Sequence, residues 1–410
     1  MVSIPASDVN PFDWDVRQNP YAFYHELQEA GPVVHLRSLD LYAVSRFADV
    51  RRVLADQRVF SSAKGVAQNA AMNVAMAGSI VGTDPPEHTR LREILGRPLT
   101  PAKLLPMRER LSQLSVTQVE RIVAAGEPVE TVSKIACFLP LTVVTELVGM
   151  PDDATSKMLT WAAAGFNGMA PEIMPGTGPA LATMGEMMGY VADPGLPERL
   201  RPNSWAAELH AASVRGEIDS DQFASMLQGY LTPSLDTTIF AMSSLLWLFS
   251  TNPDQWELLR SRPGLVSRAI NEVIRIESPV QFFSRVATED TAIDGAPVKA
   301  GSRVFVMYAA ANRDPRRFED ADRFRIDRDN TDHVGFGHSA HRCVGMNLAL
   351  MELSAMLTAL VSKVKAIELV EAKRADNAIL RGFEELVLRF VDGRSANAPN
   401  EVPEPNRAAS

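Results

Sequence analysis

The chain has 410 residues, of which 46% are hydrophobic, so it is long enough to bury a large core. Its formal net charge of −9 is spread along the chain, which argues against nucleic acid as a partner. No long linker rich in Pro, Gly or Ser, no repeat of fixed period and no low-complexity block interrupts it, so we expect a single domain over residues 1–410.

Short helices and strands alternate over the first hundred residues. The apolar spacing of Pro20–Ala30 predicts a helix, and Val33–Leu36 and Tyr42–Ser45 are typical of two strands in a small sheet. Helical spacing then dominates, with short strands expected near 285–287 and 304–308. The later helices are predicted over residues 103–123, 139–147, 154–166, 180–191, 204–212, 221–250, 265–276 and 346–360. The sequence therefore predicts a mostly α protein with small β-sheets.

The helix predicted over Asp221–Ser250 is the longest of these. Asp219 or Ser220 can cap its start, and at 1.5 Å per residue it would span roughly 45 Å. Its side chains are apolar nearly all round, so we expect a buried central helix. Pro233 lies within it and cannot donate a hydrogen bond to the carbonyl of Gly229, which predicts a kink at this point.

The remaining general features concern cellular location. Residues 1–8 lack a charged stretch followed by an apolar run, which argues against a signal peptide. The most apolar stretch, Ala241–Phe249, is far shorter than the ~20 residues that a membrane span needs. We therefore expect a soluble, cytoplasmic protein that contacts no membrane. In a reducing cytosol a disulfide between Cys137 and Cys343 is not expected, and the apolar neighbours of Cys137 indicate a core residue.

The segment Phe336–Gly345, with the sequence FGHSAHRCVG, delivers Cys343 just before the helix that begins near Met346. The start of a helix carries unpaired N–H groups and partial positive charge, which favour a thiolate. Phe336 can pack beside the sulfur and exclude water, and Gly345 lets a flat group approach the backbone closely. One cysteine cannot build a zinc site. Taken alone, the segment is also compatible with an ordinary cysteine in a surface loop.

This segment resembles the haem-binding loop of the cytochrome P450 family, F-G-x-G-x-H-x-C-x-G. Every fixed position matches except one, where Ser339 replaces a glycine, and we expect a slightly different turn there because serine tolerates positive φ poorly. The resemblance implies the family's fold, a single domain with a long central helix over the haem, and haem b (iron protoporphyrin IX) as cofactor. It also implies that Cys343 is the axial iron ligand and that His341 reaches a haem propionate.

Further segments match the same family in order and spacing. Asp84–Arg92 resembles its D-P-P-x-H-x-x-x-R segment, in which the residues matched by His88 and Arg92 bind a haem propionate. The two residues are four apart, so they share one face of a helix and can clamp a carboxylate. Arg285 matches another propionate-binding arginine of the family.

Glu272 and Arg275 resemble the family's E-x-x-R pair, which braces the core on the haem side. Residues three apart share a helix face, and such a pair by itself is common on protein surfaces. Its place about seventy residues before the cysteine loop makes the resemblance specific. We assign the pair a structural role, with Arg317 or Arg323 as third partners.

Asp236 and Thr237 lie inside an apolar helix, where polar side chains are unfavourable unless they are hydrogen-bonded. One interpretation is that the threonine hydroxyl bonds back to a helix carbonyl. The resemblance implies a catalytic acid–alcohol pair that delivers protons during oxygen activation. Pro233 and Ser234 replace the family's A/G-G pair, and a kink at the proline would also leave room for an oxygen molecule and a water.

The run Ser234–Thr238 also resembles a bacterial subgroup that oxidises small para-substituted aromatic acids. However, the loop Gly65–Thr83 contains no Lys, Arg or His, and Gln228 stands where a basic residue is expected. A buried carboxylate without a cation is unfavourable, so these residues favour a neutral aromatic substrate. The predicted substrate contacts are Pro233, Phe166, Phe282 and Phe283. For the three phenylalanines, packing in the core is the alternative interpretation.

Three functions are compatible with these residues. The favoured one is a monomeric monooxygenase that inserts one oxygen atom from O2 by hydroxylation or O-demethylation, with electrons from NAD(P)H through a ferredoxin and its reductase. The second is a peroxide-dependent thiolate-haem enzyme, against which the pair Asp236–Thr237 argues. The third is a non-catalytic haem-binding sensor, for which the sequence offers no output domain.

Overall fold

Helices form most of the fold, and the computed structural model describes residues 4–328 and 332–393. Up to residue 191 the α-helices are α1 (Trp14–Gln18), α2 (Tyr21–Ala30), α3 (Phe47–Ala55), α4 (Ala70–Ala75), α5 (Glu87–Gly96), α6 (Pro101–Leu104), α7 (Arg108–Ala125), α8 (Thr145–Val148), α9 (Asp152–Thr155), α10 (Met158–Asn167) and α11 (Thr177–Val191). After residue 191 they are α12 (Trp205–Val214), α13 (Ser220–Leu231), α14 (Asp236–Thr251), α15 (Pro253–Ser261), α16 (Val266–Ile276), α17 (Tyr308–Ala311) and α18 (Met346–Lys363). Two π-helical turns, η3 (Val132–Ala136) and η4 (Pro140–Val144), join α7 to α8.

The strands form three separate sheets. The largest has the order β1-β2-β3-β9-β6-β4, and β10 and β11 pair as a long antiparallel hairpin beside β5, while β7 pairs with β8. The strands are β1 (Ala6–Ser7), β2 (Val34–Leu36), β3 (Leu41–Val44), β4 (Phe60–Ser61), β5 (Val129–Glu130), β6 (Phe283–Ala287), β7 (Thr291–Ile293), β8 (Ala296–Val298), β9 (Arg303–Val306), β10 (Val364–Arg374) and β11 (Phe383–Asp392).

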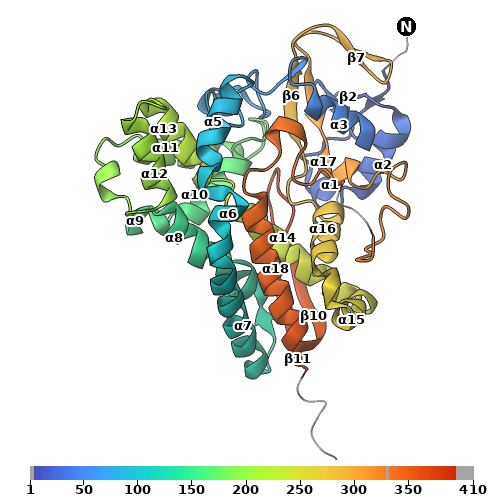
Figure 1. Ribbon diagram of the computed structural model, residues 1–410. Coiled ribbons are helices and arrows are strands. Elements are labelled where there is room, and N and C mark those ends of the chain that lie inside the picture. The colour runs from blue at the N-terminus through green and yellow to red at the C-terminus, as the bar shows by residue number, and fades with distance from the viewer. Residues whose placement is uncertain (1–3, 329–331, 394–410) are drawn as a thin grey trace, which may run out of the picture.

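Figure 1 shows how these elements are arranged. Helices α8 to α13 gather on the left, the largest sheet and its covering helices lie at the upper right, and α14, α16 and α18 stand between the two parts. Helix α14 packs against α16, α18, η3 and the β10–β11 hairpin, so it lies at the centre of the core. The predicted fold class, mostly α with small sheets and a central helix, is confirmed.

Several more detailed expectations can also be compared with the structure. The strands predicted near 285–287 and 304–308 appear as β6 and β9, whereas the β10–β11 hairpin was not predicted. Both cysteines are free, and Cys137 is buried in the core as expected. Among the described residues, no helix is both long enough and apolar enough to cross a lipid bilayer.

The predicted central helix is divided in two at Pro233. Asp219 caps α13 by accepting a hydrogen bond from the backbone N–H of Gln222, and α13 ends at Leu231. Helix α14 begins again only at Asp236. Proline has no N–H to continue the ladder, and here the ladder stops for four residues instead of merely bending. The expectation of one kinked helix over 221–250 is therefore corrected to two helices joined at Pro233.

Glu272 and Arg275 form a fully buried ion pair on α16, with both side chains at 0% exposure. Arg275 donates to Glu272 through Nε at 2.7 Å and through Nη2 at 2.8 Å. Its Nη1 donates to the carbonyl oxygens of Asn312 and Ala321, each at 2.7 Å. A buried charge is stable only when it is paired and hydrogen-bonded in this way. The pair thus fixes α16 against the irregular segment 312–328.

The third charged partner of this pair differs from the expected one. Arg328 contributes the additional guanidinium, with its Nε 3.4 Å from Glu272 Oε1. Arg323 contributes only its backbone carbonyl to Arg275, and Arg317 pairs with Asp332 instead. Of the two expected partners, Arg323 therefore takes part through its backbone carbonyl, and Arg317 pairs elsewhere. Because the segment is irregular, its side-chain directions could not be derived from sequence spacing.

We predict that Glu272→Ala destabilises the protein by about 3–5 kcal/mol, because it leaves the Arg275 charge buried without its partner. The free energy of unfolding in denaturant and the haem content after purification measure the effect. The matched control is Glu257→Ala, which removes an exposed E-x-x-R pair with Arg260 at the same spacing on α15. That control should change stability by less than about 0.5 kcal/mol. A Glu272→Ala protein as stable and as fully haem-loaded as the wild type would refute the bracing role.

Candidate functional site

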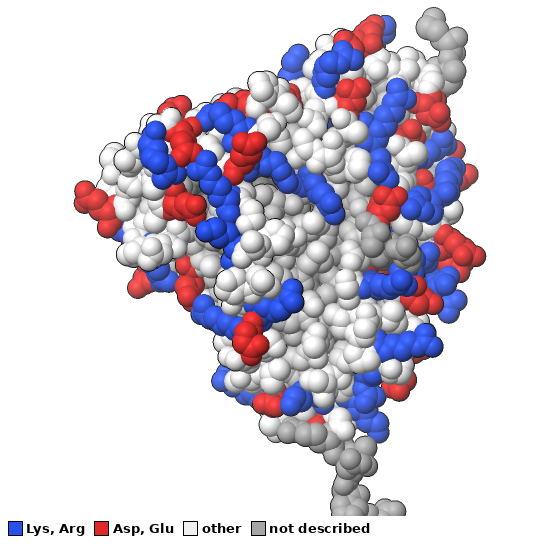
Figure 2. Space-filling model, viewed as in Figure 1, with Lys and Arg blue, Asp and Glu red and all other residues white. Residues whose placement is uncertain are grey.

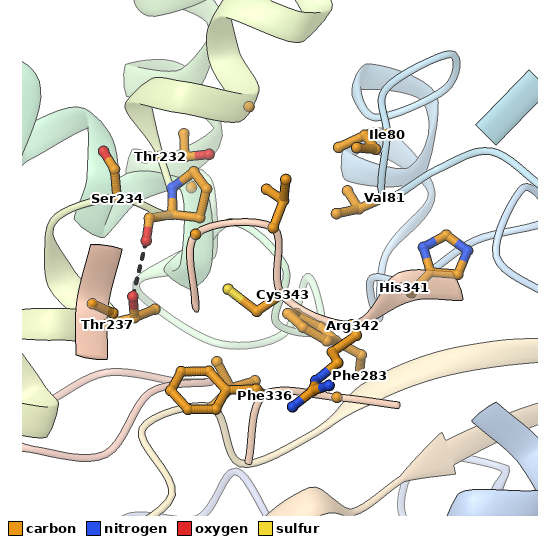
Figure 3. Close-up of a pocket in the computed structure, with 18 of the residues that line it drawn as sticks. Ile80, Val81, Thr232, Ser234, Thr237, Phe283, Phe336, His341, Arg342 and Cys343 are labelled. Atoms are coloured by element: carbon orange, nitrogen blue, oxygen red, sulfur yellow. Dashed lines mark hydrogen bonds between the residues drawn. The ribbon is translucent and has the colours of Figure 1, made fainter. Parts of the chain in front are cut away.

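A cavity of about 280 Å³ lies between the loop that carries Cys343 and the helices α13 and α14. Residues 335–345 and the first turns of α18 form one wall, and the junction of α13 with α14 forms the opposite wall. Figure 3 shows Cys343 on its loop beside Phe336, with Thr232, Ser234 and Thr237 across the space from it. The cavity thus brings together segments that lie more than a hundred residues apart in the sequence.

The loop that carries Cys343 is held by its own backbone. The N–H of Cys343 donates to the carbonyl of Phe336 at 2.8 Å, and the N–H of Gly337 donates to the carbonyl of Val334 at 2.8 Å. Gly337 has φ of 73° and Ser339 has φ of 59°. Ser339 therefore adopts the left-handed conformation in which the family has glycine. The serine side chain makes that conformation unfavourable by roughly 1 kcal/mol.

The surroundings of Cys343 act on its charge in opposite directions. Burial raises the pKa of the Cys343 thiol, while the N–H groups of Gly345 and Met346 and the guanidinium groups of Arg92 and Arg342 lower it in part. These N–H groups belong to the start of α18, as predicted from the sequence. A coordinated metal ion deprotonates a thiol outright, so the arrangement suits a metal-bound thiolate better than a free one.

Two histidines and three arginines line the cavity, and two of the arginines, Arg92 and Arg285, lie near both histidines. The rings of His88 and His341 face each other with centroids 4.1 Å apart. Both ring nitrogens of His88 and the Nε2 of His341 lack a hydrogen-bond partner among the described residues. Burial, with the positive charges of Arg92 and Arg285 nearby, lowers the pKa of His88 to about 4 and that of His341 to about 2. The site therefore brings unpartnered histidine nitrogens together with the positive charges of arginines.

These residues fit haem b. Buried, unpartnered nitrogen groups are rare in folded proteins, and such a group usually meets a ligand or ion. The two carboxylates of haem would supply acceptors for the unpartnered nitrogens of His88 and His341, and they would pair with the charges of Arg92 and Arg285. Cys343 supplies a thiolate for the iron. At Gly345 an added Cβ would meet only Cys343 Sγ, at 3.9 Å, so the chain itself leaves this approach open.

The opposite wall carries Asp236 and Thr237. The Thr237 hydroxyl donates to the carbonyl of Pro233 at 2.9 Å, as drawn in Figure 3, and the side chain lines the cavity. Asp236 is buried, and its carboxyl group contributes to raising the pKa of the Cys137 thiol, so it lies near that residue. Burial raises the pKa of Asp236 from 3.8 to about 7. The Thr237 hydroxyl group therefore lies on the cavity side of α14, whereas the Asp236 carboxyl group lies on the side toward Cys137.

The predicted substrate contacts divide into two groups. Pro233, Phe166 and Phe283 line the cavity. Phe282 does not: it is buried in the core, with its ring centroid 4.0 Å from that of Phe305. Successive residues at the start of a strand point to opposite faces, so only one of the two adjacent phenylalanines can reach the cavity. The expectation that Phe282 forms a cavity wall is corrected accordingly.

Some polar residues of the cavity were not predicted from the sequence. Glu352 on α18 is buried, its Oε1 has no partner among the described residues, and burial raises the pKa of its carboxyl group to about 8. Ser225 and Ser234 also have hydroxyl oxygens without partners there. A glutamate within the apolar run of α18 was the available signal for the first. The sequence gave no signal for the two serines, because serine is common in both buried and exposed helices.

Comparisons with known proteins agree with this geometry. Residues 248–382 match the protein family described as Cytochrome P450. The chain is 33% identical to Cytochrome p450 CYP199A2 of Rhodopseudomonas palustris, over 94% of this chain and 95% of the relative. It is 32% identical to Linalool 8-monooxygenase of Pseudomonas putida, over 92% of this chain and 97% of the relative. The solved structure of CYP109Q5 from Chondromyces apiculatus matches with a TM-score of 0.79 at 27% identity, covering 94% of this chain and 98% of that one.

The chain therefore belongs to the cytochrome P450 family, and it is a haem-thiolate oxidoreductase of the monooxygenase type. Haem b is its cofactor, and its reaction uses O2 and an electron-donating partner.

We predict that Asp236→Asn stabilises the protein increasingly as the pH rises from 4.5 to 8. The folded-state pKa of about 7 lies above the unfolded value of 3.8. Between these two pH values the folded protein keeps the Asp236 carboxyl group protonated, whereas the unfolded chain loses the proton. The stability of the wild type therefore falls as the pH rises through this range. Asparagine removes this penalty, and its advantage should widen by roughly 1–3 kcal/mol over that range. Denaturant unfolding at several pH values measures it. The control Asp221→Asn, at an exposed position on α13, should show no such widening.

Proposed function

We propose that the protein inserts one oxygen atom from O2 into a C–H bond or an O-methyl group of a small aromatic substrate. In the balanced reaction two electrons and two protons reduce the second oxygen atom to water. An O-methyl group hydroxylated in this way would break down to a phenol and formaldehyde. The observation that carries the proposal is Cys343, which lines a cavity that also contains Thr237 and the unpartnered ring nitrogens of His88 and His341.

In this proposal the Cys343 thiolate would bind the haem iron, and His88, Arg92, Arg285 and His341 would bind the haem propionates. Bound haem supplies the oxygen-activating chemistry, which a thiolate ligand favours. Phe336 lines the cavity beside Cys343, where its ring would exclude water from the sulfur. Gly345 leaves the backbone open on the same side.

Asp236 and Thr237 have separate tasks in proton delivery. Asp236, with a pKa raised to about 7 by burial, can both hold and release a proton near neutral pH. Thr237 presents its hydroxyl in the cavity and donates to the Pro233 carbonyl, so rotation of this hydroxyl can pass a proton toward the reacting oxygen. The proline also leaves the start of α14 open to water.

An aromatic substrate is supported by the cavity walls. Most of the lining is apolar and includes Phe166 and Phe283, which suits a flat apolar ring. The resemblance to the subgroup that oxidises para-substituted aromatic acids supports the same class. The arginines of the lining, Arg92, Arg285 and Arg342, belong to the side with Cys343, which favours a neutral substrate over an acid.

Electrons would come from NAD(P)H through a ferredoxin and its reductase. Arg342 is exposed next to Cys343, and Figure 2 shows Lys and Arg side chains gathered over α5 and α6 on the face in view. Cations near the haem-binding loop would attract an acidic electron carrier. All proposed site residues come from one chain, and we propose that it works as a monomer.

Two other functions compete with this one. A peroxide-dependent enzyme would need no proton delivery from Asp236 and Thr237, so the presence of both in this chain speaks against it. A non-catalytic haem sensor would need an output element, and the described residues form only the oxidoreductase fold.

We predict that the reduced, CO-bound protein has the red-shifted Soret band of thiolate ligation. Cys343→His should still bind haem but lose that band and the activity, because imidazole replaces the electron-rich sulfur. Cys137→Ser is the matched control and should keep the band, since Cys137 lies in the core away from the cavity. An absorption spectrum of histidine type in the wild type would overturn the assignment.

We predict that Thr237→Ala keeps most of the NADH consumption in a reconstituted ferredoxin system but diverts it to hydrogen peroxide. The fraction of NADH that yields product should fall several-fold, since the hydroxyl that guides the second proton is missing. Thr238→Ala, one residue further on α14, serves as the comparison and should uncouple less. Product formation that depends on added peroxide and ignores NADH in the wild type would favour the alternative enzyme.

A further inference from the structure

Helix α13 presents a stripe of small and polar residues to the cavity. Ser225, Gln228, Gly229 and Thr232 all line it, and their spacing places them on one face of the helix. The stripe ends just before Pro233, where the helix breaks. Gln228 and Thr237 lie on either side of this break, and both line the cavity.

Several polar groups around this stripe already have partners within the chain. The Thr232 hydroxyl donates to the carbonyl of Gln228 at 3.2 Å, and the Ser79 hydroxyl donates to the carbonyl of Met76 at 2.6 Å. The Tyr230 hydroxyl donates to the carbonyl of Leu95 at 2.7 Å. The protons of these three hydroxyl groups are therefore already used within the chain, so the groups cannot donate to a ligand without breaking an existing bond.

Two groups of the stripe differ from these. Oε1 of Gln228 and Oγ of Ser225 have no hydrogen-bond partner among the described residues, although the two residues are only 5% and 8% exposed. They are three residues apart on the same helix face. A buried polar atom without a partner is unfavourable, and such atoms in native proteins usually meet a ligand or a water. The pair thus points to a hydrogen-bonding ligand group.

The charge of the cavity limits what this ligand group can be. The cations of the lining are Arg92, Arg285 and Arg342, and Figure 3 shows Arg342 on the Cys343 side, near His341. Arg92 donates to the backbone carbonyl of Arg342, which places it on that side as well. A carboxylate at Gln228 would therefore be buried without a counter-ion, which is strongly unfavourable.

Apolar side chains lie next to the pair. A Cβ added at Gly229 would lie 3.7 Å from a methyl carbon of Leu95 and 4.0 Å from Ile80, which are ordinary contacts. Leu95 and Ile80 also line the cavity. An apolar ring bound beside Gln228 would therefore meet apolar neighbours.

We infer that Gln228 and Ser225 form a polar subsite that binds an uncharged hydroxyl or amide group of the substrate and directs the opposite end toward Thr237. A glutamine and a serine each offer a donor and an acceptor, which matches groups that both donate and accept. The inference rests on the proposed function and specifies its substrate class: neutral aromatic molecules with a hydrogen-bonding head and an apolar tail. Gln228 is then a specificity-determining residue.

The experiment compares three probes that share a 4-alkoxy-substituted ring and differ only in the para group: hydroxyl, methyl or carboxylate. Binding is measured from the shift of the haem absorption spectrum on titration of the haem-loaded enzyme. The wild type should bind the 4-alkoxyphenol about 5-fold or more tighter than the methyl compound, and the benzoate weakest. Gln228→Leu should abolish the preference for hydroxyl over methyl, and Ser225→Ala should reduce it.

Thr232→Val is the matched control, because it removes a hydroxyl of the same stripe that already bonds to the helix. It should leave the ratio between phenol and methyl compound unchanged. Gln228→Arg should reverse the order by favouring the benzoate, since it supplies the missing cation. The change in ratio identifies a hydrogen bond, because a merely structural effect would weaken all three probes together.

Tightest binding of the benzoate by the wild type overturns the inference, and so does an unchanged ratio in Gln228→Leu or the absence of a spectral shift with all three probes. These outcomes leave the proposed function intact if NADH-dependent oxygenation of another substrate and the thiolate Soret band are present. A wild-type protein that lacks the thiolate Soret band would refute the proposed function itself. The two failures are therefore distinguishable.

Discussion

The position of Cys343 depends on a chain of hydrogen bonds that begins at the buried ion pair of α16. Arg275 holds the carbonyl of Asn312, and the Asn312 side chain accepts from the N–H of Val334 at 2.8 Å. Val334 in turn accepts from Gly337, and Phe336 accepts from the N–H of Cys343. Each link joins backbone to a buried or half-buried group, so the position of the sulfur relative to the core is set by α16, about seventy residues upstream.

The same network explains why so polar a pair is buried. Replacement of a buried ion pair by apolar residues is often neutral or stabilising in other proteins, so the pair is not required for stability as such. Here the guanidinium of Arg275 bonds to the backbone of an irregular segment that has no regular ladder of its own. An apolar side chain could fill the same volume, but it could not satisfy those carbonyl groups.

The sequence predicted those structural features that depend on local chemistry, and it did not predict those that depend on long-range packing. The cysteine loop, the capped start of α13 and the pair on α16 follow from local spacing, and the structure contains all three. Which of Phe282 and Phe283 reaches the cavity depends on the strand register against β9, which the sequence does not display. Arg328, as the partner of Glu272, depends likewise on the path of an irregular segment.

The β10–β11 hairpin was missed for a related reason. The eleven residues of β10 mix charged and apolar side chains without a strict alternation, because the pairing with β11 contains register shifts. A bulge changes the face on which the following side chains lie, so the period of two is lost in the sequence although the strand is continuous. Ser339 shows the opposite situation: the departure from glycine is visible in the sequence, yet the residue has the positive φ that glycine favours.

The break at Pro233 separates two functions that a continuous helix would have to combine. Residues of α13 before the break face the cavity with Ser225 and Gln228, whereas Thr237 lies after it, with Asp236 behind. In an unbroken helix the rotation of 100° per residue would fix the direction of Thr237 relative to Gln228. Four residues without regular helix free the second helix to take its own rotation about its axis. The proline thus lets the proton-delivering face and the substrate-binding face be oriented independently toward one cavity.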